Sequence, residues 1–114
     1  MRKISDIIKP AFPKAEYVKG EVLLDETLSF KGYSLSKGDK GEFFVVLVEH
    51  DGKDKCFSCG GKVVMEKLKQ IAEVDKVEPN NNKVVMFKSS IQGKLISVES
   101  GSGLTYYDLA NPTE

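Results

Sequence analysis

The spacing of apolar residues predicts β-strand over much of the chain. Within residues 22–36, Leu24, Leu28 and Phe30 alternate with polar positions, and a period of two is the pattern of a strand with one buried face. Gly32 interrupts this run, and a glycine inside a long strand is a common place for a bulge or bend. The sequence therefore predicts a long first strand that curves strongly and serves two sheets.

Two further strands follow, joined by a short turn. Residues 43–48 are rich in aromatic and β-branched side chains, which favour strands. The pair Asp51-Gly52 comes next, and it is a strong hairpin signal because both central positions of such a turn need a positive φ. We therefore expect a third strand, centred on Phe57 and antiparallel to the second.

After Gly60-Gly61 the apolar period becomes helical. Val64 and Leu68 share one face with their apolar neighbours, while charged residues occupy the opposite face. The pattern predicts one amphipathic helix over about residues 62–73.

The C-terminal part of the chain predicts another strand pair. Residues 84–87 and 95–98 have strand composition, and residues 92–93, Gln-Gly, indicate a hairpin between them. Residues 100–114 form a C-terminal tail of loop composition, in which residues 104–107 either return as a final strand or pack over a sheet edge.

The predicted order of elements is β-β-β-α-β-β in a mainly β, single OB-like domain spanning residues 1–114. That order describes a five-stranded OB-type barrel in which the helix closes one end. Residues 1–20 are expected to form a short helical lead-in, because their apolar residues have helical spacing and Pro10 and Pro13 limit its length. An α+β sheet with the helix on one face is the alternative.

Composition and charge say more about where in the cell the protein is expected than about its activity. Apolar residues make up 40% of the chain and charged residues 30%, with 17 basic and 17 acidic side chains. A net charge of zero provides no overall field toward an anionic polymer or a membrane. The apolar runs are too short to span a membrane, and the N-terminus lacks the apolar centre of a signal peptide, so we expect a cytoplasmic protein.

The sequence gives little support for a catalytic site or a metal-binding site. Cys56 and Cys59 have chelate-like spacing, but His50 is the single histidine, so four zinc ligands cannot be assembled from soft donors of one chain. Ordinary reduced cysteines are favoured over a metal shared between protomers or a redox pair. Gly60-Gly61 indicates a tight turn before the helix rather than a phosphate-binding loop. We expect no enzyme, no catalytic residue, no metal and no cofactor.

One stretch of the chain resembles a known group of proteins. Residues 43–71 contain a strand of aromatic and valine residues, an acidic-Gly turn, a short strand centred on Phe57, and a helix with Val63, Leu68 and Ile71. This stretch is similar to OB-fold single-stranded DNA-binding proteins of bacteriophages and mobile elements of Gram-positive bacteria. The resemblance implies sequence-independent binding of single-stranded DNA, in replication or recombination inside the bacterial host cell.

Lysines interleaved with aromatic residues are the pattern expected for such binding, since bases stack on aromatic rings and lysines contact phosphates. OB domains bind through their second and third strands and the adjoining loops. We therefore expect Tyr33 and Phe57 to be stacking residues. The ring of Phe57 is accessible if its face of the third strand points outward, and the bulge at Gly32 decides which way Tyr33 points. The complete predicted nucleic-acid-binding set is Lys31, Tyr33, Lys37, Lys40, Lys53, Lys55, Phe57, Lys88 and Lys94.

A protein-interaction module or accessory subunit on the same scaffold is the alternative function. It is motivated by the second strand, in which both faces are apolar although only one needs to be. Phe43, Val45 and Leu47 are expected to be covered either by the N-terminal Ile7, Ile8 and Phe12 or by a second subunit in a homodimer.

Overall fold

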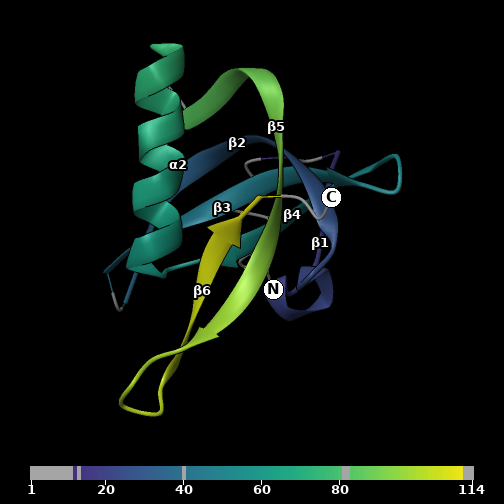
Figure 1. Cartoon of the computed structure of the whole chain (residues 1–114). Coiled ribbons are helices and arrows are strands. Elements are labelled where there is room, and N and C mark those ends of the chain that lie inside the picture. The colour runs from purple at the N-terminus through teal and green to yellow at the C-terminus, as the bar shows by residue number, and fades with distance from the viewer. Residues whose placement is uncertain (1–11, 13, 40, 81–82, 112–114) are drawn as a thin grey trace, which may run out of the picture.

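A computed structural model describes residues 12, 14–39, 41–80 and 83–111. The elements are β1 (Glu16–Tyr17), the 3-10 helix η1 (Gly20–Leu23), β2 (Thr27–Gly38), β3 (Gly41–His50), β4 (Lys53–Cys59), α2 (Lys62–Asp75), β5 (Val84–Glu99) and β6 (Thr105–Ala110). The strands form a six-stranded sheet in the order β1-β4-β3-β2-β5-β6 (Figure 1). The mainly β prediction is therefore confirmed.

The predicted bend of the long first strand lies in β2, where the pairing register shifts between Phe30 and Gly32 on both sides of the strand. At Gly32 the neighbouring strand approaches so closely that an added Cβ would lie 2.3 Å from the Val85 carbonyl oxygen. Glycine is required here because the position lacks room for a side chain.

Two other local predictions are also confirmed. β3 and β4 are antiparallel, and the turn between them has φ of 55° at Asp51 and 77° at Gly52. α2 spans Lys62–Asp75, close to the predicted 62–73. It ends at Lys76, whose left-handed backbone (φ 56°) lets its N–H bond to the Ala72 and Glu73 carbonyls.

The predicted hairpin at residues 92–93 is wrong, because Val84–Glu99 is one continuous strand, β5. Its first part pairs with one half of β2, its middle with the other half, and its last part with β6. Gly93 is a packing position rather than a turn: an added Cβ would lie 3.0 Å from the Ala110 carbonyl oxygen and 3.3 Å from the Phe30 ring. The actual turn contains Gly103 (φ 85°), and the predicted tail therefore contributes a final strand, β6.

The predicted closed five-stranded barrel is also wrong, because the sheet is open: β1 and β6 form its two edges, and β4, next to β1, does not pair with β6. The segment that joins β1 to β2 lies between β4 and β6 instead. β1 pairs in parallel with β4, and Leu24 forms a bridge with Leu95 of β5. An added Cβ at Gly20 would lie 3.3 Å from the Tyr107 ring of β6 and 3.5 Å from the Phe57 ring of β4.

The prediction for the N-terminal part of the chain is corrected for the residues that the structure describes. The helical part of the lead-in falls on residues 1–11, which lie outside the described residues. Residues 22–23, the start of the predicted first strand, belong to η1 (Gly20–Leu23) instead, and the strand begins at Thr27. Asp25 has a positive φ of 64°, which interrupts an extended chain at that point.

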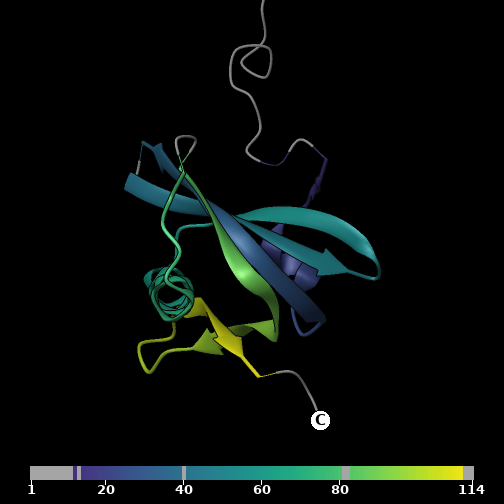
Figure 2. The same cartoon turned by 90° about the horizontal axis from the view of Figure 1, so that it is seen from above.

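The core lies between the sheet and α2, which packs on one face of the sheet beside β5 and β6 (Figure 2). α2 buries Val64, Leu68 and Ala72 there. The largest fully buried side chains are those of Phe44, Phe57, Leu23, Leu28, Leu68, Leu95, Val46, Val48, Val64 and Val85. Within the described ranges, no helix has the length and apolar character needed to cross a membrane.

Candidate functional site

The sheet has a second face, which looks away from α2 and which we call the outer face. Residues paired directly across neighbouring strands point their side chains to the same side. Val45 pairs with Ser34 and Ser58, whereas the core residue Phe44 pairs with Leu35 and Cys59. By this register the outer face comprises Gly32, Ser34 and Ser36 of β2, Phe43, Val45 and Leu47 of β3, Cys56 and Ser58 of β4, and Met86 of β5.

Tyr17 extends this face from β1, because it pairs with Cys56 and its hydroxyl hydrogen-bonds with that of Ser58. Tyr17 is 62% exposed, and the ring of Phe43 is partly exposed. Small side chains lie beside both rings, because Tyr17 pairs with Cys56 and bonds to Ser58, and Phe43 pairs with Ser36. The outer face therefore presents aromatic surface to solvent.

The two aromatic residues predicted to stack on bases lie in the core instead. Phe57 is fully buried, because it pairs with Val46 on the core face. Tyr33 is 4% exposed and its ring stacks on Phe44 with 4.3 Å between centroids. Burial also raises the pKa of the Tyr33 hydroxyl above its ordinary value. The prediction that these rings are accessible is therefore wrong.

Two predicted lysines are held by neighbouring side chains. The Lys31 ammonium group lies 2.8 Å from an Asp54 carboxylate oxygen and 4.0 Å from one of Glu49. The hydrogen bond to Asp54 raises the pKa of Lys31, with the two carboxylate charges acting in the same direction and burial opposing them. Lys55 Nζ lies 3.0 Å from His50 Nδ1. Neither lysine is a free cation for a phosphate.

The remaining predicted lysines do not gather in one place. Lys37 lies where β2 ends and Lys53 where β4 begins, at opposite ends of the ten-residue strand β3. At about 3.3 Å per residue the two positions are roughly 30 Å apart. Lys88 and Lys94 lie along β5, and Lys40 lies outside the described residues.

A different set of lysines shares one hollow, which we call the lysine pocket. It has a volume of about 370 Å³ and is lined by Leu35, Ser36, Lys37, Glu42, Lys69 and Lys83. Lys37 was in the predicted set, but Lys69 of α2 and Lys83 before β5 were not. Sequence patterns could not bring these three together, because the contact depends on how α2 packs against the end of β2.

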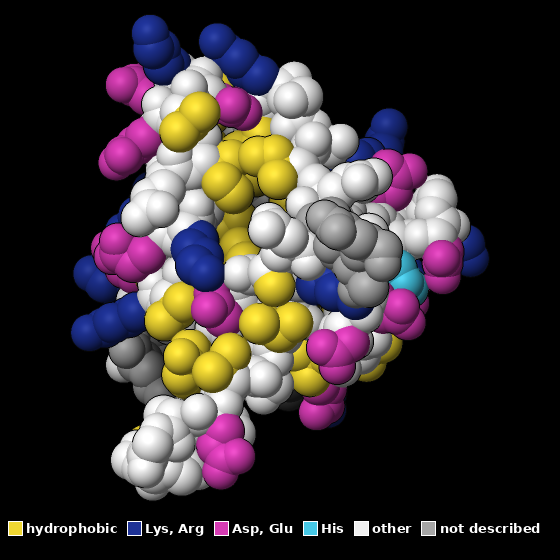
Figure 3. Space-filling view, in the orientation of Figure 1, with side chains coloured by type: hydrophobic (Ala, Val, Ile, Leu, Met, Phe, Trp, Pro, Cys, Tyr) yellow, Lys and Arg dark blue, Asp and Glu magenta, His cyan; other side chains and the backbone are white. Residues whose placement is uncertain are grey.

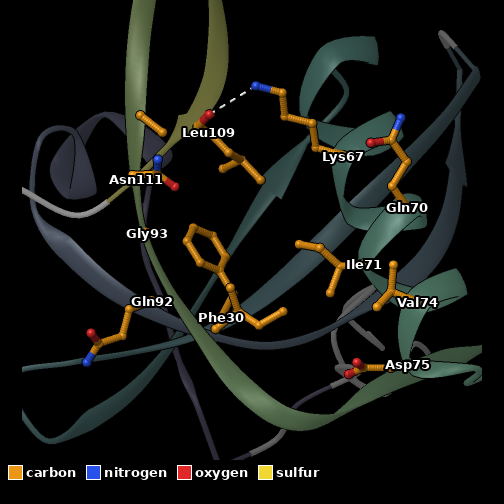
Figure 4. Close-up of a pocket in the computed structure, with 12 residues that line it drawn as sticks. Phe30, Lys67, Gln70, Ile71, Val74, Asp75, Gln92, Gly93, Leu109 and Asn111 are labelled. Carbon is orange, nitrogen blue, oxygen red and sulfur yellow. Dashed lines mark hydrogen bonds between the residues drawn. The ribbon is translucent and has the colours of Figure 1, made fainter.

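An apolar groove lies on the other side of α2, where the helix faces β5 and β6 (Figure 3). Its volume is about 740 Å³. Ile71 and Phe30 face each other across it (Figure 4). The lining residues are Phe30, Ile71, Val74, Ile91, Leu109, Gly93 and Ala110, with Lys67, Gln70, Asp75, Gln92 and Asn111 as the polar members.

The charged groups of this groove already have partners within the chain. Lys67 Nζ lies 2.6 Å from Asp108 Oδ1 and donates to the Leu109 carbonyl oxygen at 3.1 Å. Burial acts to raise the pKa of Asp108, but the hydrogen bonds from Lys67 and the Leu109 N–H, with the Lys67 charge, lower it overall. Asp75 accepts a hydrogen bond from the Lys88 backbone N–H at 3.0 Å.

The cysteines are placed as ordinary core and sheet residues. Cys56 pairs with Leu47 on the outer face and Cys59 with Phe44 on the core face, so the two side chains point to opposite sides of β4. Burial raises the pKa of both thiols, and for Cys59 a hydrogen bond from the Gly61 backbone partly opposes this. The described ranges contain no group of three or more His, Cys, Asp or Glu side chains that could hold a metal.

Comparison with protein-family models, with curated proteins and with solved structures finds no match to this chain. The outer face, the lysine pocket and the apolar groove are therefore the candidate functional surfaces of the chain.

Proposed function

We propose that this domain binds single-stranded DNA, without sequence specificity, across the outer face of β2, β3 and β4. The observation that carries the proposal is the aromatic surface of this face, where Tyr17 is exposed beside Ser58 and Phe43 is partly exposed beside Ser36. A base stacked on an aromatic ring contributes about 1–3 kcal/mol, and stacking accepts every base. The strands anticipated for binding are retained, but the proposed surface is their opposite face, and different aromatic residues carry it.

The order of elements along the chain supports this choice of surface, although the sheet is open rather than a closed barrel. An OB domain is a partly open Greek-key barrel that binds through its second and third strands. In an OB-type assignment β3 and β4 occupy those positions, since β2 is the long bent first strand and α2 follows β4. These two strands contribute Phe43, Val45, Leu47, Cys56 and Ser58 to the outer face.

The distribution of charge along the outer face favours a DNA strand that runs toward the lysine pocket. Phe43 neighbours Glu42, and Glu42 pairs with Lys37 of that pocket. At the opposite end of β3, the cation of Lys31 is paired with Asp54 and Glu49. Phosphate contacts would therefore concentrate near Phe43, and with few such contacts the affinity should be moderate and strongly dependent on salt.

Fluorescence polarisation with labelled oligo-dT and with duplex DNA, at about 50 and 200 mM salt, tests the proposal. The expected result is preference for the single strand, and affinity that falls as salt rises, with a slope of about −0.7 per phosphate contact. Tyr17→Ala should weaken oligo-dT binding by about 1–3 kcal/mol. Absence of binding at the lower salt, or equal binding of duplex, would contradict the proposal.

The apolar groove favours a second function, recognition of a partner protein. Since Lys67 and Asp75 are already bonded within the chain, the fitting occupant is an uncharged apolar peptide segment that inserts a side chain between Phe30 and Ile71. Selection from an apolar peptide library, followed by Val74→Glu, tests this. Val74 is 81% exposed, so the variant should fold and lose the peptide, while Tyr17→Ala should keep it.

A homodimer through Phe43, Val45 and Leu47 would use the outer face and so compete with DNA. Leu47 is 7% exposed in the single chain, whereas Phe43 and Val45 are partly exposed. Covering Leu47 therefore requires no second subunit. Mass measurement by light scattering, with and without oligo-dT, separates the two uses: a dimer formed through this face should dissociate when DNA binds.

A further inference from the structure

Three lysines line the lysine pocket, and among the described residues they lack the ion pairs that Lys31 and Lys67 form. The ion pairs between described residues involve Lys31, His50 and Lys67, and none involves Lys37, Lys69 or Lys83. Glu42 is the acidic residue that lines the pocket. The lining therefore carries two positive charges in excess.

The three lysines come from separate parts of the fold. Lys69 projects from α2, and its Nζ lies 5.9 Å from the centre of the Phe44 ring, within the range of a cation–π interaction. Lys83 has a left-handed backbone, with φ of 61°, and its carbonyl oxygen accepts a hydrogen bond from the Leu35 N–H. Lys37 lies near the end of β2. The pocket thus depends on packing of the folded chain rather than on one flexible segment.

We propose that the lysine pocket binds a phosphate group. Like charges in one pocket repel each other, and a dianion relieves that repulsion while it accepts hydrogen bonds from the ammonium groups. The Ser36 hydroxyl, in the same lining, is a further donor. With about 370 Å³, against roughly 30 Å³ for a water molecule, the pocket has room for a phosphate and part of its hydration shell.

The phosphate can come from a DNA strand on the outer face or from a free phosphate compound. The inference goes beyond the proposed function, because inorganic phosphate alone is enough to test it. If a DNA strand supplies the phosphate, a terminal phosphomonoester is a better ligand than an internal phosphodiester. The phosphomonoester carries close to two negative charges at neutral pH, whereas the phosphodiester carries one.

The test is a titration of the ¹⁵N-labelled full chain with inorganic phosphate at about pH 7.5, against sodium chloride of matched ionic strength, followed by NMR. Saturable shifts are expected at the amides of Leu35, Ser36 and Lys83. The double variant Lys69→Ala, Lys83→Ala should weaken phosphate binding about tenfold or more, and Glu42→Gln should strengthen it about threefold, because it removes the one negative charge of the lining. Lys53→Ala, at the far end of β3, is the matched control and should change nothing.

A second arm compares oligo-dT that carries a 5′-phosphate with the same oligonucleotide ending in a 5′-hydroxyl. Tighter binding of the phosphorylated strand, lost in the double variant, assigns the pocket to a DNA end. Equal binding of the two strands, with phosphate still bound, assigns it to a free phosphate compound. Shifts that do not saturate, or that persist unchanged in the double variant, overturn the inference. Failure of oligo-dT binding alone would overturn the proposed function and leave phosphate binding standing.

Discussion

Gly32 decides which side chains of β2 reach the core. Leu28 and Phe30 are buried on the core face, and strict alternation would place Tyr33 on the outer face. The bulge between Phe30 and Gly32 inserts an extra residue, so Tyr33 lies on the core face with them. A single glycine thus removes an aromatic ring from the outer face.

Replacing Gly32 with alanine should therefore be strongly destabilising. The added Cβ would lie 2.3 Å from the Val85 carbonyl oxygen, which is backbone and cannot move without separating β2 from β5. We expect a loss of about 1–3 kcal/mol or more in the free energy of unfolding, measured in urea. Gly101→Ala is the control, because its Cβ would meet no atom within 4 Å. Equal stability of the two variants would contradict the account of the bulge.

Aromatic residues on the two faces of the sheet should respond in opposite ways to removal. Phe57→Ala should lose about 3–5 kcal/mol of stability, because its fully buried ring leaves a cavity. Tyr17→Ala should lose less than about 1 kcal/mol, because the ring is 62% exposed, while weakening oligo-dT binding. Chemical denaturation and fluorescence polarisation on both variants check this. A stable Phe57→Ala variant with weakened binding would restore Phe57 to a binding role.

At this scale the sequence predicted the place of the bulge but not its effect on the side chains beyond it. A glycine within a strand indicates a bend, yet the number of inserted residues depends on the pairing with both neighbouring strands. Phe57 was ambiguous for another reason, because both faces of β3 and β4 are partly apolar. Alternation alone then leaves the core face undetermined.

At the scale of elements, the contact between α2 and β6 protects an open sheet edge. β6 pairs with β5 on one side only. Near its end, the Leu109 N–H bonds to Asp108 Oδ1 and the Leu109 carbonyl oxygen accepts from Lys67. Side-chain bonds to the backbone of an edge strand hinder its pairing with another chain. The Lys67–Asp108 pair therefore ties the helix to the edge it covers.

The pH dependence of stability should reveal the contribution of the Lys67–Asp108 ion pair. The pKa of Asp108 is lowered in the folded state, so its contribution is present above the unfolded pKa of about 3.9 and is lost as the pH falls through the folded value. Asp108→Asn should cost at most about 1 kcal/mol at neutral pH, since the pair is partly exposed. Its stability should begin to converge with that of the wild type below about pH 3.9 and should match it once the pH is below the lowered pKa of the folded state.

Urea denaturation across this pH range measures the effect, with Glu66→Gln on the exposed face of α2 as the control. The control should follow the wild type at every pH. A constant difference between Asp108→Asn and the wild type down to low pH would show that the aspartate charge is not responsible.

Elements with a strong local signal were predicted well, and those that depend on distant partners were not. The Asp51-Gly52 turn and α2 are determined by residues close together in sequence. β5 was divided in two because a Gln-Gly pair resembles a turn, whereas Gly93 serves the close approach of Ala110 and Phe30. β1 has two residues and pairs with β4 in parallel, across about forty positions of sequence, so no local pattern could reveal it.

On the scale of the whole molecule, the lysines differ in whether a neighbouring side chain holds them. The chain is neutral in sum. Lys31, Lys55 and Lys67 interact with neighbouring side chains, whereas Lys37, Lys69 and Lys83 border a common pocket beyond the end of the outer face. Net charge could not reveal this arrangement, because it emerges when α2 packs against the end of β2. Aromatic surface and local positive charge thus adjoin in a neutral protein.

Photocrosslinking tests most directly whether the outer face is the DNA-binding surface. An oligonucleotide of about 16 nucleotides, the upper site size of an OB domain, would carry a photoreactive pyrimidine and be irradiated on the full chain. Mass spectrometry then identifies the residues joined to it. We expect crosslinks at Tyr17 and Phe43, which disappear when unlabelled oligo-dT competes. Competed crosslinks confined to the apolar groove, at residues such as Ile71 or Val74, or no competed crosslink at all, would contradict the account.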